Sequence, residues 1–249
     1  MSGTVYLVGA GPGAPDLLTL RAARLLEAAD IVFHDALVHP GVLALAARAA
    51  KVAVGKRCGR YSSAQEFINK RLLDAVRRHR VVVRLKGGDP MLFGRAHEEI
   101  SFLKDKNIPV QVVPGVTAAL AASAELGVSL TRRGVARSVV FATPRQGEGE
   151  AASGWAQAVA GADTAVLYMA AGDALAVRDA LLAAGLRPET PVILAENVSL
   201  AEAASVRGRL AELAQLAASR DDGPAVLLIG DVFYAVRALR QPRAASQSA

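Results

Sequence analysis

The residues best suited to chemistry follow a β-branched run at 81–83, which predicts a buried strand. Directly after this run come two cations, a pair of glycines and a carboxylate, namely Arg84, Lys86, Gly87, Gly88 and Asp89. Ligands of open α/β sheets bind outside the carboxyl ends of the strands, and glycines there let a ligand approach the backbone. This stretch is therefore predicted to be the reaction centre.

More charges are expected at the same site. A helix is predicted to begin after Gly94, and Arg95 and Glu98, three residues apart, would share one face of its first turn. Further arginines occur at strand ends or turns, at Arg132, Arg133 and Arg137. Each arginine alone is equally explained as a surface charge. Clustered guanidinium groups, however, bind carboxylates through two hydrogen bonds each, which favours a substrate with several carboxylates.

A glycine turn at 9–13 separates an expected strand at 4–8 from a helix predicted at 17–28 and capped by Asp16. Strand, glycine turn and helix suggest dinucleotide binding, as in NAD(P) oxidoreductases. The spacing disagrees, because the third glycine comes one residue early and Pro12 lacks the N–H that a pyrophosphate would use. The NAD(P) interpretation and a turn with no ligand, as in a binding module, stay as weaker alternatives.

Two other features have both a structural and a functional interpretation. The basic loop at 55–62, which contains Lys56, is either a solvated surface loop or an anion-binding arm. Met169 follows a strand predicted at 164–168. A methionine at a strand end usually serves packing, but a soft thioether also suits a pocket for adenine or a sulfonium.

The composition is that of a folded α/β protein, with 249 residues, 52% of them hydrophobic and 21% charged. We expect an N-terminal domain at 1–115, a C-terminal domain at 116–240 and a flexible tail at 241–249. The start of the chain lacks a basic leader and no apolar run is long enough to span a bilayer, so a cytoplasmic protein without membrane contact is expected. The single cysteine and the spacing of the four histidines indicate no disulfide and no metal site.

The motifs exclude several reaction types. The chain has no G-x-S-x-G sequence, no Walker loop and no Cys/His nucleophile pair, which disfavours hydrolysis and phosphoryl transfer. The net charge of +6 indicates a polyanionic partner without distinguishing a nucleic acid from a polycarboxylate.

Together, several segments give the chain a specific family resemblance. They are VYLVGAGPG at 5–13, LLTLRAARLLEAADIV at 17–32, VVRLKGGDPMLFGRAHEE at 82–99, IPVQVVPGVTAA at 108–119, GVSLTRRG at 127–134, TPVILAEN at 190–197 and GPAVLLIGDV at 223–232. In these motifs the chain resembles the uroporphyrinogen-III C-methyltransferases, class III S-adenosylmethionine-dependent enzymes of tetrapyrrole biosynthesis. The resemblance covers nearly the whole chain.

The resemblance implies a fold and an activity. The fold is two α/β domains with the active site in the cleft between them, usually in a homodimer. The activity is methylation of uroporphyrinogen III at two ring carbons by S-adenosylmethionine, giving precorrin-2 and S-adenosylhomocysteine. Precorrin-2 leads to sirohaem, cobalamin or haem d1. The partner is then a small tetrapyrrole and not a nucleic acid.

The resemblance also implies roles for individual residues. The cofactor contacts it implies are Pro12, Gly87, Gly88, Asp89, Leu92, Phe93, Thr117, Ala118, Met169 and Ala225. The substrate contacts are Arg84, Arg95, Glu98, Arg133 and Met169, with Asp35 and Lys56 nearby. After methylation a proton must leave the macrocycle, and Arg95 is implicated in that step. A guanidinium stays protonated at neutral pH, so Asp35 or Glu98, oriented by Arg95, is the chemically easier base.

Three departures from the family pattern affect the second domain and one strand end. They are Ala142-Thr143-Pro144-Arg145 in place of Thr-Gly-His, Val198-Ser199 in place of Gly-Thr, and His34-Asp35 in place of Tyr-Asp. Another corrin-pathway methyltransferase is the alternative within the superfamily. The ribosomal-RNA ribose methyltransferases are a further one that the basic charge would suit. Arg84 and the RLKGGDP sequence favour the uroporphyrinogen enzymes.

Overall fold

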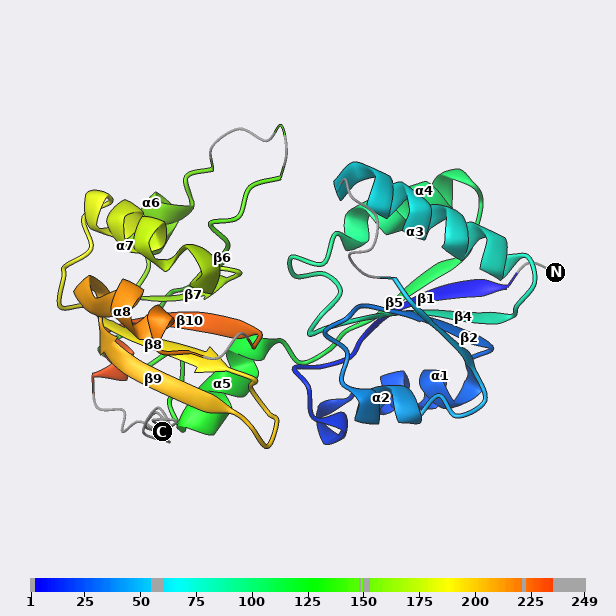
Figure 1. The fold of residues 1–249 in the computed structure, drawn as a ribbon, viewed down its shortest axis with the longest axis horizontal. Coiled ribbons are helices and arrows are strands. Elements are labelled where there is room, and N and C mark those ends of the chain that lie inside the picture. The colour runs from blue at the N-terminus through cyan, green and yellow to red at the C-terminus, as the bar shows by residue number, and fades with distance from the viewer. Residues whose placement is uncertain (1–2, 55–60, 148, 150–152, 221–222, 235–249) are drawn as a thin grey trace, which may run out of the picture. The chain divides into compact units, whose positions relative to one another are not determined.

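The computed structural model describes residues 3–54, 61–147, 149, 153–220 and 223–234, and its contacts divide the chain into two compact units, Met1–Ala118 and Ala119–Ala249 (Figure 1). The first unit ends at Ala118, three residues after the domain boundary that the sequence predicted at 115. The tail expected at 241–249 lies outside the described residues, as does Lys56.

The first unit is a parallel sheet covered by helices on both faces. Its strand order is β3-β2-β4-β1-β5, and every pairing in it is parallel. The strands are β1 (Thr4–Gly9), β2 (Ile31–His34), β3 (Ala50–Ala53), β4 (Val81–Lys86) and β5 (Val110–Val113). The helices are α1 (Leu20–Ala28), α2 (Pro40–Ala44), α3 (Tyr61–Val76) and α4 (Ala96–Asp105), with the 3-10 turn η1 (Pro15–Leu17). Because all strands run the same way, their carboxyl ends meet at one edge of the sheet.

The strand β4 lies in the middle of this sheet and distributes its side chains to two cores. Val83 and Leu85 pack into the core between the sheet and the helices α1 and α2 (Figure 1). Val82 faces the opposite core, with Leu72 of α3 and Leu103 of α4. Side chains alternate along a strand, so Arg84 and Lys86 point to the same side as Val82. The last residues of β4 thus place two cations in the layer between the sheet and the helices α3 and α4.

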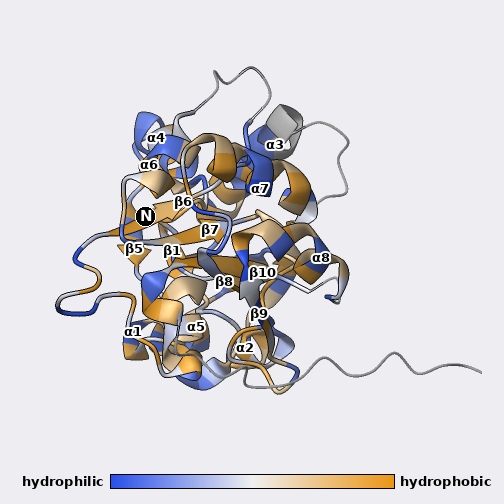
Figure 2. Ribbon diagram, turned by 90° about the vertical axis from the view of Figure 1, so that its left-hand side faces the viewer, coloured by the Kyte–Doolittle hydropathy of each residue, from blue (hydrophilic) through white to orange (hydrophobic). Residues whose placement is uncertain are grey.

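The second unit is a mixed sheet with strand order β6-β7-β10-β8-β9. β6 and β7 are parallel, and the remaining pairings are antiparallel. Its strands are β6 (Val139–Ala142), β7 (Thr164–Tyr168), β8 (Pro191–Glu196), β9 (Ala204–Arg209) and β10 (Ala225–Gly230). Its helices are α5 (Ala118–Leu126), α6 (Trp155–Ala160), α7 (Ala174–Ala183) and α8 (Leu213–Ala218), with short 3-10 turns η2 (Ala171–Asp173), η3 (Leu210–Glu212) and η4 (Asp231–Phe233). Figure 2 shows hydrophobic residues concentrated in strands such as β1 and β7.

The α/β class predicted from the sequence is confirmed, and three local predictions are wrong. The helix expected at 17–28 begins at Leu20, because Thr19 and not Asp16 accepts the N–H of Ala22. The strand expected to end at Val83 continues to Lys86, so Arg84 and Lys86 belong to the sheet. The strand β9 was not expected, since its sequence lacks a strong apolar alternation.

In each unit, the carboxylate of one aspartate links the beginnings of two neighbouring strands. Asp30, just before β2, accepts hydrogen bonds from the backbone N–H groups of Arg80 and Val81 at the start of β4, at 2.8 and 2.9 Å. Asp163, just before β7, does the same for Arg137 and Ser138 next to β6, at 2.8 and 2.9 Å. The hydrogen bond from Val81 lowers the pKa of Asp30 below its ordinary value. Each aspartate therefore satisfies backbone donors that precede the sheet ladder.

We predict that Asp30→Ala lowers the free energy of unfolding by about 1 kcal/mol at neutral pH, because two backbone donors lose a charged acceptor that is exposed to solvent. A depressed folded-state pKa gives stability that is present above the ordinary pKa of 3.8 and is lost as the pH falls through the folded value. The difference between Asp30→Ala and the parent should shrink below that pH. Urea unfolding at several pH values measures it, and an undiminished difference in acid would contradict the assignment.

Candidate functional site

Three loops meet at the carboxyl edge of the first sheet. The loop after β1 and the loop after β4 form an isolated antiparallel bridge, in which Gly88 N–H donates to Gly11 at 2.7 Å and Gly11 N–H donates to Gly88 at 3.2 Å. The carboxylate of Asp89 joins the loop after β5, accepting the N–H of Gly115 at 2.9 Å. Its other oxygen accepts the N–H of Met91 at 2.8 Å. The loops are therefore fixed to one another by backbone and carboxylate hydrogen bonds.

Glycine is required where these loops cross. A Cβ on Gly115 would lie 2.2 Å from the carbonyl oxygen of Gly88, and one on Gly9 would lie 2.6 Å from Gly115. Gly88 itself has a φ of +65°, in the left-handed region. No side chain fits at this crossing, so the backbones of the three loops are in direct contact.

Gly87 differs from these glycines because its neighbourhood is open. A Cβ built on Gly87 would meet only the Cβ of Leu37, at 3.6 Å, an ordinary contact distance. Its φ is not in the left-handed region. Nothing in the packing of the described residues demands glycine at position 87, which is what a surface left bare for a ligand would look like. Of the other predicted cofactor contacts in this unit, Pro12 lies in the loop after β1, Leu92 and Phe93 follow Asp89, and Thr117 and Ala118 follow Gly115.

The segment between Asp89 and α4 places an exposed ion pair near these loops. Phe93 and Arg95 both have left-handed backbone, with φ of 53° and 54°. Arg95 is the N-cap residue of α4, and its guanidinium grips Glu98 through two hydrogen bonds of 2.7 Å each. Those hydrogen bonds are the main cause that lowers the pKa of Glu98. Glu98 is thus held as a carboxylate with both oxygens engaged.

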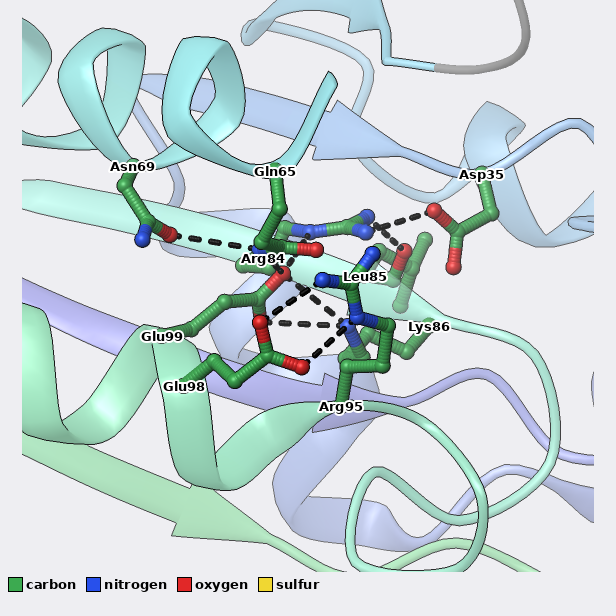
Figure 3. Close-up of polar contacts among 9 residues, drawn as sticks. All are labelled: Asp35, Gln65, Asn69, Arg84, Leu85, Lys86, Arg95, Glu98 and Glu99. Atoms are coloured by element: carbon green, nitrogen blue, oxygen red, sulfur yellow. Dashed lines mark hydrogen bonds and ion pairs between the residues drawn. The ribbon is translucent and has the colours of Figure 1, made fainter. Parts of the chain in front are cut away.

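A second group of charges is buried beneath α3 and α4 (Figure 3). Arg84 and Lys86 are each 3% exposed, and Glu99 on α4 is fully buried between them. Arg84 extends from Glu99 to Asp35, the residue directly after β2. Its Nη2 lies 2.6 Å from Oδ1 of Asp35. Asp35 is therefore oriented by Arg84, whereas Arg95 orients Glu98, the other carboxylate expected as a base.

The predicted residues of the second unit lie at one end of two neighbouring strands, with one exception. Met169 directly follows β7, with φ of 56° and 44% of its surface exposed. Ala225 begins β10, whose next residue, Val226, pairs with Tyr168. Met169 and Ala225 are consequently close to the same strand ends. Arg133, the exception, lies in the exposed turn between the bridge residues Arg132 and Ala136.

The family model for the tetrapyrrole (corrin/porphyrin) methylases matches residues 4–214. This chain belongs to that family. A uroporphyrinogen-III C-methyltransferase of Pseudomonas aeruginosa is 42% identical over 238 residues, covering 93% of this chain and 95% of the relative. The fold class and the family resemblance inferred from the sequence are confirmed.

Two other similar proteins extend the comparison. The structure of uroporphyrin-III C-methyltransferase from Thermus thermophilus, complexed with S-adenosylhomocysteine, has a TM-score of 0.82 at 42% identity and covers 92% of this chain and 98% of its own. The sirohaem synthase of Zymomonas mobilis is 43% identical over 231 residues, or 92% of this chain. The methylase chain spans about half the length of that synthase, 49%.

The structure adds two residues that the sequence interpretation did not assign to the site. They are Glu99, which holds Arg84 and Lys86, and Gly115, which belongs to the loop crossing. A signal for Glu99 existed, because Ala96, Glu99 and Leu103 recur at helical spacing and all three are buried. Among the described residues, no group of three metal-ligating side chains comes together, and no helix is long and apolar enough to cross a membrane.

The packing around Gly87 and Gly115 predicts how an alanine at each position changes the free energy of unfolding. Gly115→Ala should lower the free energy of unfolding by about 2 kcal/mol or more, because its Cβ overlaps backbone that cannot move alone. Gly87→Ala should stay within about 0.5 kcal/mol of the parent. Denaturant unfolding of both variants measures the difference, and equal midpoints would mean that the loop crossing is less tightly packed than described.

Proposed function

We propose that this methylase transfers methyl groups from S-adenosylmethionine to two ring carbons of uroporphyrinogen III, giving precorrin-2. The observation that carries the proposal is the combination of a bare glycine surface at Gly87, beside the Gly88 and Asp89 crossing, with exposed and buried arginines at the same sheet edge. The names of the similar proteins from Pseudomonas aeruginosa and Thermus thermophilus agree with it.

The residues of the glycine crossing fit the cofactor. An open backbone at Gly87 admits a nucleoside or amino-acid group without a Cβ in the way, and the loop is held rigid by Asp89 and Gly115. Pro12, Gly87, Gly88, Asp89, Leu92, Phe93, Thr117 and Ala118 of the first unit would hold it, with Met169 and Ala225 of the second. When bound, S-adenosylmethionine supplies an electrophilic methyl group on a sulfonium. The chain's contribution is then chiefly orientation of the two reactants.

The cationic side chains fit a polycarboxylate substrate. Arg95 and Glu98 are 45% and 47% exposed in their side chains, so a substrate carboxylate can replace Glu98 on the guanidinium fork. Arg133 lies in an exposed turn, and Lys56 lies outside the described residues. We assign Arg95, Arg133 and Lys56 to the substrate's acetate and propionate groups.

Asp35 is the residue that we propose to accept the proton that leaves the macrocycle after methylation. Its Oδ1 accepts a hydrogen bond from Arg84, whereas no described residue hydrogen-bonds to its Oδ2. Glu98 has both oxygens engaged by Arg95, and these hydrogen bonds lower its pKa below its ordinary value, which weakens it as a base. Arg95 therefore binds and orients the substrate, while Asp35 takes the proton.

On the family resemblance we also propose a cytoplasmic homodimer. Sedimentation of the pure protein would test the dimeric state.

The direct test incubates the purified chain with uroporphyrinogen III and S-adenosylmethionine. The expected product is a tetrapyrrole that carries two added methyl groups, identified by a mass gain of two CH2 units and by its chromophore, with two S-adenosylhomocysteine molecules released per tetrapyrrole. A product with one methyl group at full conversion, or no product, would contradict the proposal. Substrates in which the carboxylates are esterified serve as the control for the role of the arginines.

Two variants should separate the two halves of the site. Arg95→Ala should lower turnover roughly 100-fold because the substrate loses its orienting fork, while S-adenosylhomocysteine still binds within about threefold of the parent affinity. Gly87→Ala should weaken S-adenosylhomocysteine roughly tenfold or more, since its methyl group occupies the bare surface. Calorimetric titration and steady-state kinetics measure both. Loss of cofactor binding in Arg95→Ala with retained turnover would reverse the assignment.

A further inference from the structure

Glu99 is the centre of the buried charges shown in Figure 3. Its Oε1 accepts hydrogen bonds from Arg84 Nε at 3.1 Å, Lys86 Nζ at 3.0 Å and Gln65 Nε2 at 3.2 Å. Its Oε2 accepts a second bond from Lys86 at 3.1 Å. Gln65 is itself tied to Asn69 one turn along α3. One carboxylate thus joins β4, α3 and α4 from a position without solvent.

A buried group of charges costs free energy to form. Removing charges from water costs more than their attraction usually returns, and an apolar cluster in the same place would commonly be as stable. An apolar environment is at hand, because Val82, Leu72 and Leu103 form the core on this face of the sheet. Stability alone therefore does not account for Glu99. What the network holds at its outer end is the better explanation.

Arg84 transmits the position of Glu99 to Asp35. All three nitrogens of its guanidinium are engaged: Nε by Glu99, one terminal nitrogen by the carbonyl of Leu85 at 3.2 Å, and the other by Asp35 at 2.6 Å. A guanidinium held at both ends has one orientation. With 3% of Arg84 exposed, its fork is directed at Asp35 and not toward a substrate carboxylate.

We propose that Glu99 is a positioning residue for the methyl-transfer reaction: it anchors Arg84, and Arg84 holds Asp35 with one oxygen bound and the other presented to the substrate. This rests on the proposed function, in which Asp35 accepts the proton. It also assigns Arg84 to the support of Asp35 in place of the direct substrate contact expected from the sequence. Asp35, 32% exposed in its side chain, is the point where the network meets the site.

Lys86 completes the network as the counter-charge of Glu99. Burial, followed by the neighbouring charge of Arg84, lowers the pKa of Lys86, and Glu99 acts against both effects. Among the described residues, the cations that act on Asp35 are Arg84, through a hydrogen bond, and Lys86, through its charge, both from β4, while His34 bonds to the backbone carbonyl of Asp35 through Nδ1 at 3.1 Å. Removal of the Glu99 charge consequently removes the shared partner of Arg84 and Lys86.

The experiment compares Glu99→Gln with the parent, because glutamine keeps the shape and removes the charge. The expected result is a kcat lower by about 100-fold, with the KM for uroporphyrinogen III and the dissociation constant of S-adenosylhomocysteine both within about threefold. Glu212→Gln is the matched control, since it makes the same change in the exposed pair with Arg209 and should leave all three constants unchanged.

A second measurement is independent of turnover. In ¹⁵N-arginine-labelled protein without substrate, the Nε–H of Arg84 should exchange slowly with water, because it is buried and bonded to Glu99. In Glu99→Gln that exchange should be at least about tenfold faster. Arg84→Lys, which lacks this proton, identifies the signal. The lysine variant also keeps the charge but cannot reach both carboxylates, so its kcat should fall as in Glu99→Gln.

The outcomes are distinct. A raised KM with an unchanged kcat in Glu99→Gln would overturn the proposal and return Arg84 to substrate binding, and unchanged constants with unchanged exchange would overturn it outright. If Glu99→Gln fails to bind S-adenosylhomocysteine because it does not fold, Arg84→Lys decides the question by the same kinetic comparison. A parent protein without turnover would defeat the proposed function, whereas slow Arg84 exchange that depends on Glu99 would still support the anchoring contact.

Discussion

The two cations at the end of β4 impose the constraint on which the first unit depends. β4 is the middle strand, so Arg84 and Lys86 enter an interior that is otherwise mostly apolar. A buried cation without a partner is not tolerated, and the partner has to come from the helices above. Glu99 meets this requirement only if α4 lies across the strand end in one register. The charge balance therefore determines where α4 begins and what its first turn presents.

The start of α4 shows the consequence. Arg95 and Glu98 occupy the first turn, and with Glu99 turned inward they face outward as a pair. The chain reaches this start through left-handed residues at Phe93 and Arg95, which are uncommon for side chains of this size and persist only where surrounding contacts compensate. The buried Glu99 is one such contact. An interior salt bridge and an exposed one are thus set by the same helix, one residue apart.

The glycine crossing is the complementary constraint, and it acts through the absence of side chains. Gly9 at the end of β1, Gly88 after β4 and Gly115 after β5 touch through backbone atoms. Because the strands are parallel, these loops emerge at one edge, and the crossing joins them into a rigid floor. A floor that is already rigid loses little conformational entropy when a ligand binds. Such a floor would favour affinity for that reason.

The sequence predicted the architecture well because its periodic signals were strong. The apolar runs of β1 and β7 and the glycine-rich strand ends at 9–13 and 87–88 specified an α/β protein with a site at the strand termini. The partners of the charges were not predictable in the same way, since a charge in a sequence does not show whether it is buried. Arg84 was expected at the surface of the site and lies inside it, while Glu99, next to the more conspicuous Glu98, carries the network. The contacts that decide these roles span 15 to 49 residues along the chain, beyond any local pattern.

These placements give two carboxylates of the same edge different chemistry. Glu98 is exposed and neutralised by the fork of Arg95, and its lowered pKa keeps it ionised, which suits exchange of one carboxylate for another on the guanidinium. Asp35 is held from behind by an arginine that is itself immobilised by Glu99, with one oxygen left toward the site. An acceptor of a proton needs a fixed direction and a lone pair that is not already used. Both oxygens of Glu98 already accept hydrogen bonds from Arg95, so in the proposed function the exposed pair binds substrate, and Asp35, whose arginine has a buried anchor, takes the proton.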